Sequence, residues 1–277
     1  MSTTPSDPTA STPTKASTAV PKGSLSKLAP MLRRNGLLIF FAFLLVVFTI
    51  ARPEFLSQAN IRNILLSASV IGILALGQTV VILTGGFDIG IAKTAVLAGM
   101  VVALTAGMGP VALLIGILAT VAVGLVNGIL ISRTKVNPFI VTLGMYTILT
   151  SVALLVNNGG SIINLPQWLI DLVGWQWLGM PGIVWWFAII AIITHVALAY
   201  TRWGGHIYAV GGNEEAARLA GIKSSNVLAS AYVVASVVGG LAGVMLTSRL
   251  GTASPVALPG AELDSIAAVV IGGTKLS

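Results

Sequence analysis

The stretch "TAVLAGMVVALTAGMGPVALLIGILATVAVGLVNGILIS", residues 94–132, contains no charged side chain. A helix that crosses the hydrocarbon core of a bilayer needs about 20 apolar residues, so this run is long enough for two crossings. The turn-forming sequence "GMGP" at 107–110 divides the run. The stretch therefore predicts two membrane-spanning helices joined by a tight turn.

The composition extends this interpretation to the whole chain. Of 277 residues, 56% are hydrophobic and only 8% are charged, whereas soluble domains carry about 25% charged residues. We therefore expect an all-α polytopic membrane bundle with about eight transmembrane helices in this chain. Besides the two helices of 94–132, the expected spans lie at about 35–51, 62–88, 138–156, 182–201, 226–247 and from 265 onward.

The basic residues predict the orientation of the spans. The net charge is +7, and most Lys and Arg side chains fall on alternate connections, which are cytoplasmic if the N-terminus is cytoplasmic. This assignment requires residues 94–106 to cross the membrane. Residues 1–34, rich in Ser, Thr, Pro and Ala, predict a disordered cytoplasmic tail ahead of a transmembrane domain at 35–277. We expect lipid, and not nucleic acid, to face the basic residues.

One charged island interrupts the apolar chain, "GGNEEAARLAGI" at 211–222. Asn213 can cap a short helix, and Gly221 can end it in a left-handed conformation. Glu214 and Arg218 stand at i and i+4, a favourable spacing for an ion pair. The pattern predicts a two-turn helix on the cytoplasmic surface. From these residues alone, a solvated loop helix and a docking helix remain equally open.

Several motifs give the chain a resemblance to a known family. "EAARLAG" at 215–221 resembles the EAA loop of ABC import permeases. Three longer stretches are similar to the ribose/xylose/galactose branch of that group: "GQTVVILTGGFDIGIAKTAVLAG" (77–99), "VNGILISRTKVNPFIVTLGMYTIL" (126–149) and "ELDSIAAVVIGGTKL" (262–276). Family members continue past the "GGT" turn with about two more spans, so we expect this chain to be truncated at its C-terminus relative to the family.

The resemblance implies a function. The chain would be the permease subunit of a binding-protein-dependent importer for a ribose-like monosaccharide, in the bacterial cytoplasmic membrane. It would have no enzymatic activity and no cofactor. Its partners would be a cytoplasmic ABC ATPase, an extracytoplasmic sugar-binding protein and a second permease copy. The helix that couples to the ATPase would contain Glu214, Glu215, Ala216, Ala217 and Gly221.

Other candidate residues lie within the spans and at their outer ends. Gln78, Thr79 and Asn127 are uncharged polar residues that can line a sugar pathway, although most such residues join helices together. The motif "TGGFDIG" at 84–90 predicts a break at which Asp88 caps the next helix, or alternatively a broken helix along the pathway.

Two outer residues are candidates for contact with the binding protein, Trp168 and Glu262. The alternative for Trp168 is a plain interfacial loop at 157–181, where tryptophans are common. Asp264 is expected to cap the last helix. Small residues at four-residue spacing, such as Gly124 and Gly128, predict close helix packing.

The sequence is also compatible, to different degrees, with three other functions. A permease for another small polar solute fits the same features. A stand-alone secondary transporter is disfavoured, because such proteins place ionisable residues at mid-membrane. A membrane enzyme is disfavoured because the spans contain no catalytic or metal-binding constellation, and the chain has no cysteine.

Overall fold

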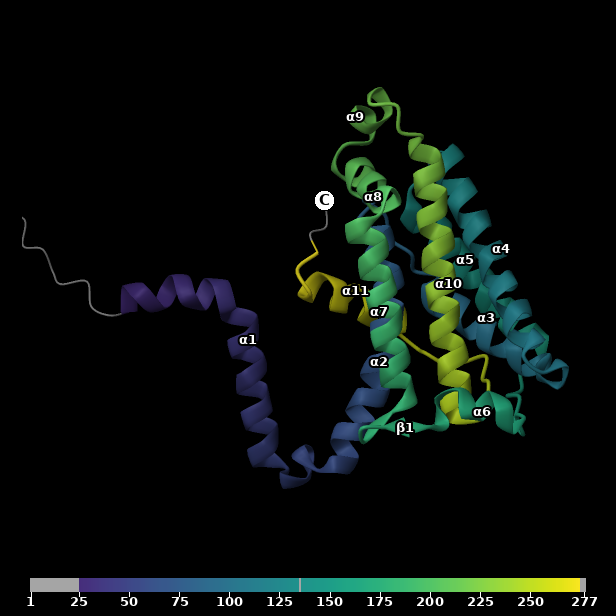
Figure 1. The fold of residues 1–277 in the computed structure, drawn as a ribbon, viewed down its shortest axis with the longest axis horizontal. Coiled ribbons are helices and arrows are strands. Elements are labelled where there is room, and N and C mark those ends of the chain that lie inside the picture. Colours follow the sequence, from purple (N-terminus) through teal and green to yellow (C-terminus); the bar gives the residue numbers. More distant parts are fainter. Residues whose placement is uncertain (1–24, 135, 275–277) are drawn as a thin grey trace, which may run out of the picture. The chain divides into compact units, whose positions relative to one another are not determined.

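The computed structural model describes residues 25–134 and 136–274, and these are almost entirely helical (Figure 1). The chain divides into two units, 1–53 and 54–277, which are described separately. The first contains α1 (Leu25–Ala51), and η1 (Pro53–Leu56) follows it. The elements of the second unit are α2 Gln58–Ile82, α3 Ile91–Leu104, η2 Ala106–Met108, α4 Val111–Thr134, α5 Pro138–Val156, α6 Gln167–Gly174, β1 Gln176–Trp177, β2 Met180–Pro181, α7 Gly182–Tyr200, α8 Arg202–Gly212, α9 Glu214–Leu219, α10 Ser224–Leu250 and α11 Ala261–Ile271.

The first helix begins earlier than the sequence predicted. Residues 25–34 belong to α1, although the disordered tail was expected to extend to residue 34. The sequence "LSKLAPMLRR" contains several good helix formers, which favour this extension. The rest of the predicted tail, residues 1–24, lies outside the described residues.

Among the described residues, five helices are long and apolar enough to cross a membrane: α2, α4, α5, α7 and α10. The expected count of eight is therefore not confirmed, whereas the polytopic helical class is. The helices α3 and α11 have only 14 and 11 residues. Almost every residue of α3 is buried, so other helices cover it and its length need not match the bilayer.

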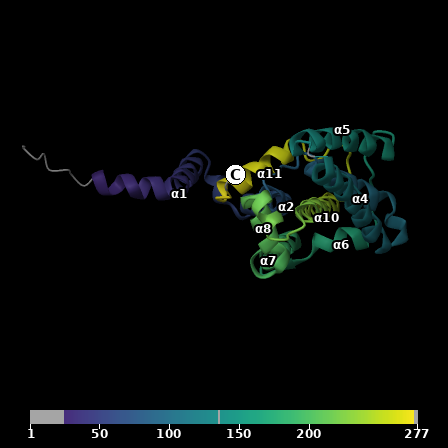
Figure 2. The same cartoon turned by 90° about the horizontal axis from the view of Figure 1, so that it is seen from above.

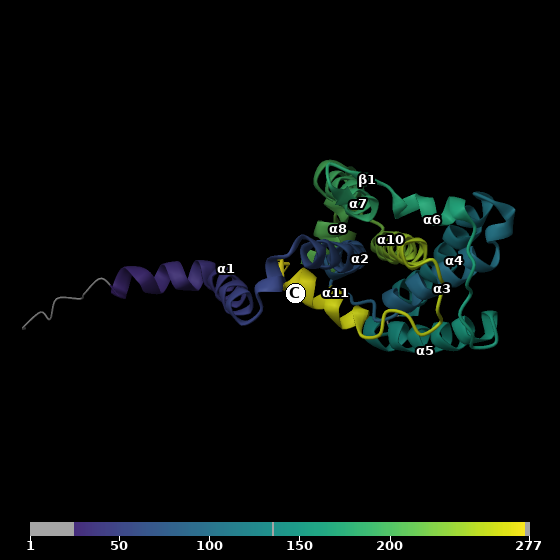
Figure 3. The same ribbon diagram turned by 90° about the horizontal axis from the view of Figure 1, so that it is seen from below.

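The long helix α10 forms the centre of the second unit. It packs against α2, α3 and α4, and the two end views place it between α2 and α4 (Figures 2 and 3). A Cβ on Gly124 would lie 2.6 Å from the Cα of Val233, and one on Gly128 would lie 2.7 Å from the carbonyl oxygen of Ala229. The predicted close packing at these small residues is confirmed, because any side chain there would push α4 away from α10.

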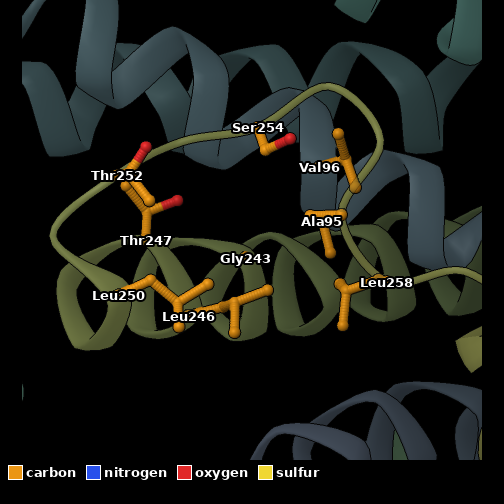
Figure 4. Close-up of a pocket in the computed structure, with 10 residues that line it drawn as sticks. Ala95, Val96, Gly243, Leu246, Thr247, Leu250, Thr252, Ser254 and Leu258 are labelled. Carbon is orange, nitrogen blue, oxygen red and sulfur yellow. The ribbon is translucent and has the colours of Figure 1, made fainter. Parts of the chain in front are cut away.

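The contact between α3 and α10 is equally tight. A Cβ on Gly243 of α10 would overlap the carbonyl oxygen of Ala95 of α3. Beside this crossing, Figure 4 shows a small cavity of about 10 Å³ between the two helices and residues 252–258. This volume holds about one water molecule. Part of the irregular segment after α10, including the buried Ala253, is therefore packed against α3 and α10.

The bundle has two distinct ends (Figure 1). The α6 end holds α6 and the β1–β2 hairpin, where α7 begins and α10 ends; the α9 end holds α8 and α9, where α7 ends and α10 begins. Before α3, the Ile89 N–H donates to Thr142 Oγ1 in the first turn of α5 (3.2 Å). After α3, the Ala106 carbonyl accepts from Trp168 Nε1 of α6 (3.3 Å). Although short, α3 thus runs from the α9 end toward α6, and the α4–α5 connection shares an end with α9. That residues 94–106 cross a membrane stays a prediction.

Candidate functional site at the α9 end

The charged island folds as the short helix that its sequence predicts. Asn213 Oδ1 accepts from the Ala216 N–H at 2.8 Å and so caps the first turn. Gly221 has φ of 85° and ends the helix, with the Ile222 N–H donating to the Ala217 carbonyl at 3.0 Å. Both predicted termini are confirmed. A helix of six residues is marginal alone, so its packing must hold it in place.

The ion pair of α9 differs from the expected one. Arg218 pairs with Glu215 instead of Glu214, through Nε to Oε2 (3.1 Å) and Nη2 to Oε1 (2.5 Å). The i, i+3 spacing brings two of the guanidinium nitrogens to one carboxylate, a geometry that favours Arg. The hydrogen bond and the charge of Glu215 raise the pKa of Arg218. Both side chains are mostly exposed, so the pair shapes the surface of α9 more than it stabilises the fold.

The two faces of α9 have different environments. Ala217 is buried in a cluster that includes Ile207 of α8 and Val227 of α10, so it attaches α9 to its own subunit. Leu219 lies about half a turn away and is 78% exposed. The other predicted coupling residues, Glu214, Glu215, Ala216 and Gly221, are exposed too. The sequence predicts an apolar aspect of this helix at Ala216, Leu219 and Ala220, and all three are exposed. The buried residue is Ala217, opposite Leu219 by helical spacing.

An open cavity of about 950 Å³ lies at the α9 end of the bundle. Its lining includes Glu214, Glu215 and Arg218 of α9 and residues 84–86. The end of α4, the start of α5 and Tyr232 of α10 complete its walls. The charged helix and the non-helical segment between α2 and α3 therefore border the same open space.

This non-helical segment, residues 83–90, is held by polar side chains from three helices. The Phe87 carbonyl accepts from Thr142 Oγ1 of α5 and from Tyr232 Oη of α10, each at 3.4 Å. The Gln78 amide of α2 faces the peptide groups of Asp88. With its nitrogen toward Asp88 O (3.1 Å) and its oxygen toward Asp88 N (3.2 Å), it satisfies both. We refer to Gln78, Thr142 and Tyr232 as the polar clamp.

Asp88 does not cap α3 as expected. The N-cap residue of α3 is Gly90, and no side chain caps it. The Asp88 side chain is fully buried, and neither carboxylate oxygen has a hydrogen-bond partner in the described part of the chain. The break itself was predicted from "TGGFDIG". The clamp was not, because Tyr232 lies 145 residues from Phe87 in the sequence.

The predicted pathway residues do not gather on one surface. Gln78, Asp88 and Asn127 are fully buried. Thr79 is partly exposed and donates to the Ala75 carbonyl at 2.7 Å. Neither polar atom of the Asn127 amide has a partner among the described residues. A role in the pathway stays a prediction for all four.

The two predicted outer contacts lie in different surroundings. Trp168 is half-buried and tied to the Ala106 carbonyl. Glu262 is only 8% exposed, and contact of either residue with a binding protein stays a prediction. Asp264 lies inside α11, whose N-cap residue is Gly260, so the expected capping role is wrong. The helix starts four residues earlier than Ser265 because Gly260, with φ of 76°, turns the chain into it.

The fold and its apolar helices define a multi-pass membrane protein. Residues 60–277 match the family described as "branched-chain amino acid transport system / permease component", and the chain belongs to that family. Its members and the relatives below are transport permease components and not enzymes.

Individual relatives are similar over most of the chain. The ribose import permease protein RbsC of Bacillus subtilis (strain 168) is 38% identical over 263 residues, 92% of this chain and 79% of that protein. The L-arabinose ABC transporter permease protein AraH of Azospirillum brasilense is 35% identical over 250 residues, 89% and 74% of the two chains. The D-allose transport system permease protein AlsC of Escherichia coli (strain K12) is 33% identical over 247 residues, 87% and 76%. No solved structure matches the chain.

Proposed function

We propose that this chain is the membrane-spanning subunit of an ABC importer for a monosaccharide in the bacterial cytoplasmic membrane. A separate ATPase would hydrolyse ATP on the cytoplasmic side, and an extracytoplasmic binding protein would deliver the sugar. Two copies of the chain would form the pathway. The observation that carries this proposal is the similarity, over most of the chain, to permeases named for ribose, L-arabinose and D-allose import.

A second candidate substrate class comes from the family description, which names branched-chain amino acids. The individual relatives favour the sugar, because all three are named for monosaccharides. The test is uptake of labelled ribose, arabinose, allose and leucine by the native host, with the gene disrupted and then restored. We expect loss and recovery of uptake for one of the sugars. Loss of leucine uptake alone would replace the sugar with an amino acid.

The α9 end would face the cytoplasm and hold the ATPase. Exposed Leu219 gives α9 an apolar anchor, and the paired Glu215 and Arg218 give it a polar rim. A central apolar side chain within a polar rim is the usual anatomy of a protein interface. Glu214, Ala216 and Gly221 would lie at the same contact, whereas Ala217 would hold α9 to the bundle.

The substitution Glu215→Lys tests this docking role. It replaces the ion pair with two like charges at i and i+3, while leaving every membrane span unchanged. We expect normal membrane insertion and loss of ATPase association, measured by co-purification. Glu54→Lys, far from α9 in the sequence, serves as a control for added positive charge. Sugar uptake at the normal rate by the Glu215 variant, with the native copy absent, would refute the docking role.

The remaining assignments complete the proposal. The N-terminus would be cytoplasmic, with residues 35–277 as the transmembrane domain. Trp168 and Glu262 would lie on the side that meets the binding protein. Gln78, Thr79, Asp88 and Asn127 would lie along or beside the sugar pathway. The burial of Gln78, Asp88 and Asn127 favours a supporting position for these three over direct contact with sugar.

A further inference from the structure

The helix α8, which directly precedes α9, contacts the non-helical segment between α2 and α3. Gly211, in the last turn of α8, packs so closely on the end of α2 that a Cβ there would overlap the Leu83 carbonyl oxygen. Gly212, the next residue, has nothing within 4 Å of its Cβ position. Asn213 then caps α9. A displacement of α9 that carries the end of α8 with it would therefore press on Leu83.

Leu83 is the first residue of the non-helical segment 83–90. Its first residues, 83–86, continue the backbone hydrogen bonds of α2. Its central peptide groups bond instead to the polar clamp of Gln78, Thr142 and Tyr232. These are a few hydrogen bonds from side chains on three separate helices. Such a segment has a defined resting position, but its peptide groups can exchange hydrogen-bond partners without unfolding a helix.

The segment also has space beside it. The cavity of about 950 Å³ touches Thr84, Gly85 and Gly86 and extends to α9. Close packing fixes most of the bundle, because interiors at crystal-like density resist displacement. Thr84 and Gly86 are buried and Gly85 is exposed, and the N–H groups of residues 84–86 bond to carbonyls in the last turn of α2. The segment 83–90 is therefore in contact with α8, next to a void and fixed at its centre by a small number of bonds.

We infer that residues 83–90 are the hinge through which α9 moves the bundle, with Gly211 as the contact that transmits the motion. The polar clamp residues are positioning residues that set the resting state of this hinge. The inference rests on the proposed docking of an ATPase on α9. From the hinge the motion reaches α3, which begins at Ile91 and packs on α4, α5 and α10.

The first test compares Gly211→Ala with Gly212→Ala in the complete importer, reconstituted with its ATPase and binding protein. Both changes raise helix propensity alike, but only the first overlaps Leu83. We expect Gly211→Ala to assemble and hydrolyse ATP while the ratio of sugar transported to ATP hydrolysed falls about tenfold. Gly212→Ala should leave this ratio unchanged. Equal ratios for the two variants would overturn the inference.

A second measurement decides the matter if Gly211→Ala fails to assemble. The chain contains no cysteine, so Thr84→Cys provides a single label site on the cavity wall. We expect its rate of reaction with a soluble maleimide to differ about threefold or more between the nucleotide-free and ATP-bound complex. We also expect Tyr232→Phe, which lacks the bond to Phe87, to reduce that difference. The same rate in both states would overturn the inference.

These outcomes separate the inference from the proposed function. If the unaltered chain transports sugar with no ATPase, or never binds one, the proposed function fails. If it binds the ATPase and transports, but Gly211→Ala and Gly212→Ala behave alike, only the hinge fails. The transport-to-hydrolysis ratio is the decisive readout, because a general loss of folded protein lowers both rates and leaves their ratio unchanged.

Discussion

The α6 end and the α9 end hold their connecting segments by different means. At the α6 end, tryptophan side chains donate to backbone carbonyls on other elements: Trp168 to Ala106 at 3.3 Å and Trp186 to Leu172 at 2.9 Å. At the α9 end, Gly211 rests against the Leu83 carbonyl and a large cavity lies beside it. The α9 end has a directed bond as well, from Trp203 Nε1 of α8 to Ser230 Oγ of α10 at 2.8 Å. The difference lies in the segment next to the large cavity, which is in contact with α8 and has room to move.

This difference agrees with the function proposed for each end. A surface that receives a binding protein benefits from rigidity, since a preordered site loses less conformational entropy on binding. A surface that transmits motion needs an element with two available positions. The comparison therefore predicts that substitutions at the α6 end change stability, whereas those at the α9 end change coupling.

The largest expected effect concerns which end faces the cytoplasm. With no native cysteine, Gly160→Cys marks the α6 end and Gly212→Cys marks the α9 end. In right-side-out vesicles, we expect an impermeant maleimide to label residue 160 fully and residue 212 only after the membrane is opened. Labelling of residue 212 in sealed vesicles would invert the comparison and remove the basis for ATPase docking on α9.

The second-largest expected effect concerns two exposed leucines, one at each end of the bundle. Leu219 at the α9 end is 78% exposed and Leu178 at the α6 end is 74% exposed. A central anchor of an interface contributes about 2 kcal/mol or more, so we expect Leu219→Glu to weaken ATPase binding about 30-fold. The matched variant Leu178→Glu should bind the ATPase normally. Affinity is measured with purified ATPase and the permease in nanodiscs; equal affinities would contradict the docking role of Leu219.

The sequence predicted those features that depend on local pattern. The run expected at 138–156 is α5 (Pro138–Val156), because Asn137 caps the helix and Pro138 favours its first turn. The ends of α9 were predicted for the same kind of reason, since Asn213 and Gly221 act on their own neighbours. The small residues of α4 also indicated close packing before their partner helix was known.

The features that the sequence did not predict depend on distant contacts. The short length of α3 follows from its burial by α4, α5 and α10, which periodicity cannot reveal. The helix α8 was not predicted as a helix. Its residues 202–212 include four glycines, which have low helix propensity. The clamp joins Gln78, Thr142 and Tyr232, which lie on three different helices. Glu214 and Glu215 both stand at a spacing that permits an ion pair with Arg218, and the sequence alone does not decide between them.

The smallest effect tests the rigidity of the α6 end. Trp168→Phe keeps an aromatic ring but removes the N–H that donates to the Ala106 carbonyl. A buried hydrogen bond of this kind contributes about 1 kcal/mol, so the unfolding temperature in detergent should fall by a few degrees, as expected for roughly 1 kcal/mol. Trp177→Phe is the matched control, since Trp177 is 56% exposed and contacts Trp185 through its ring.

The outcome also bears on the division between the two ends. If Trp168→Phe lowers the unfolding temperature and leaves the ratio of transport to hydrolysis unchanged, the tryptophan bonds fix the α6 end without taking part in coupling. If instead the ratio falls with no loss of stability, the α6 end moves during transport as well. In that case α3, which ends beside Trp168, carries the motion across the bundle instead of dissipating it at the hinge.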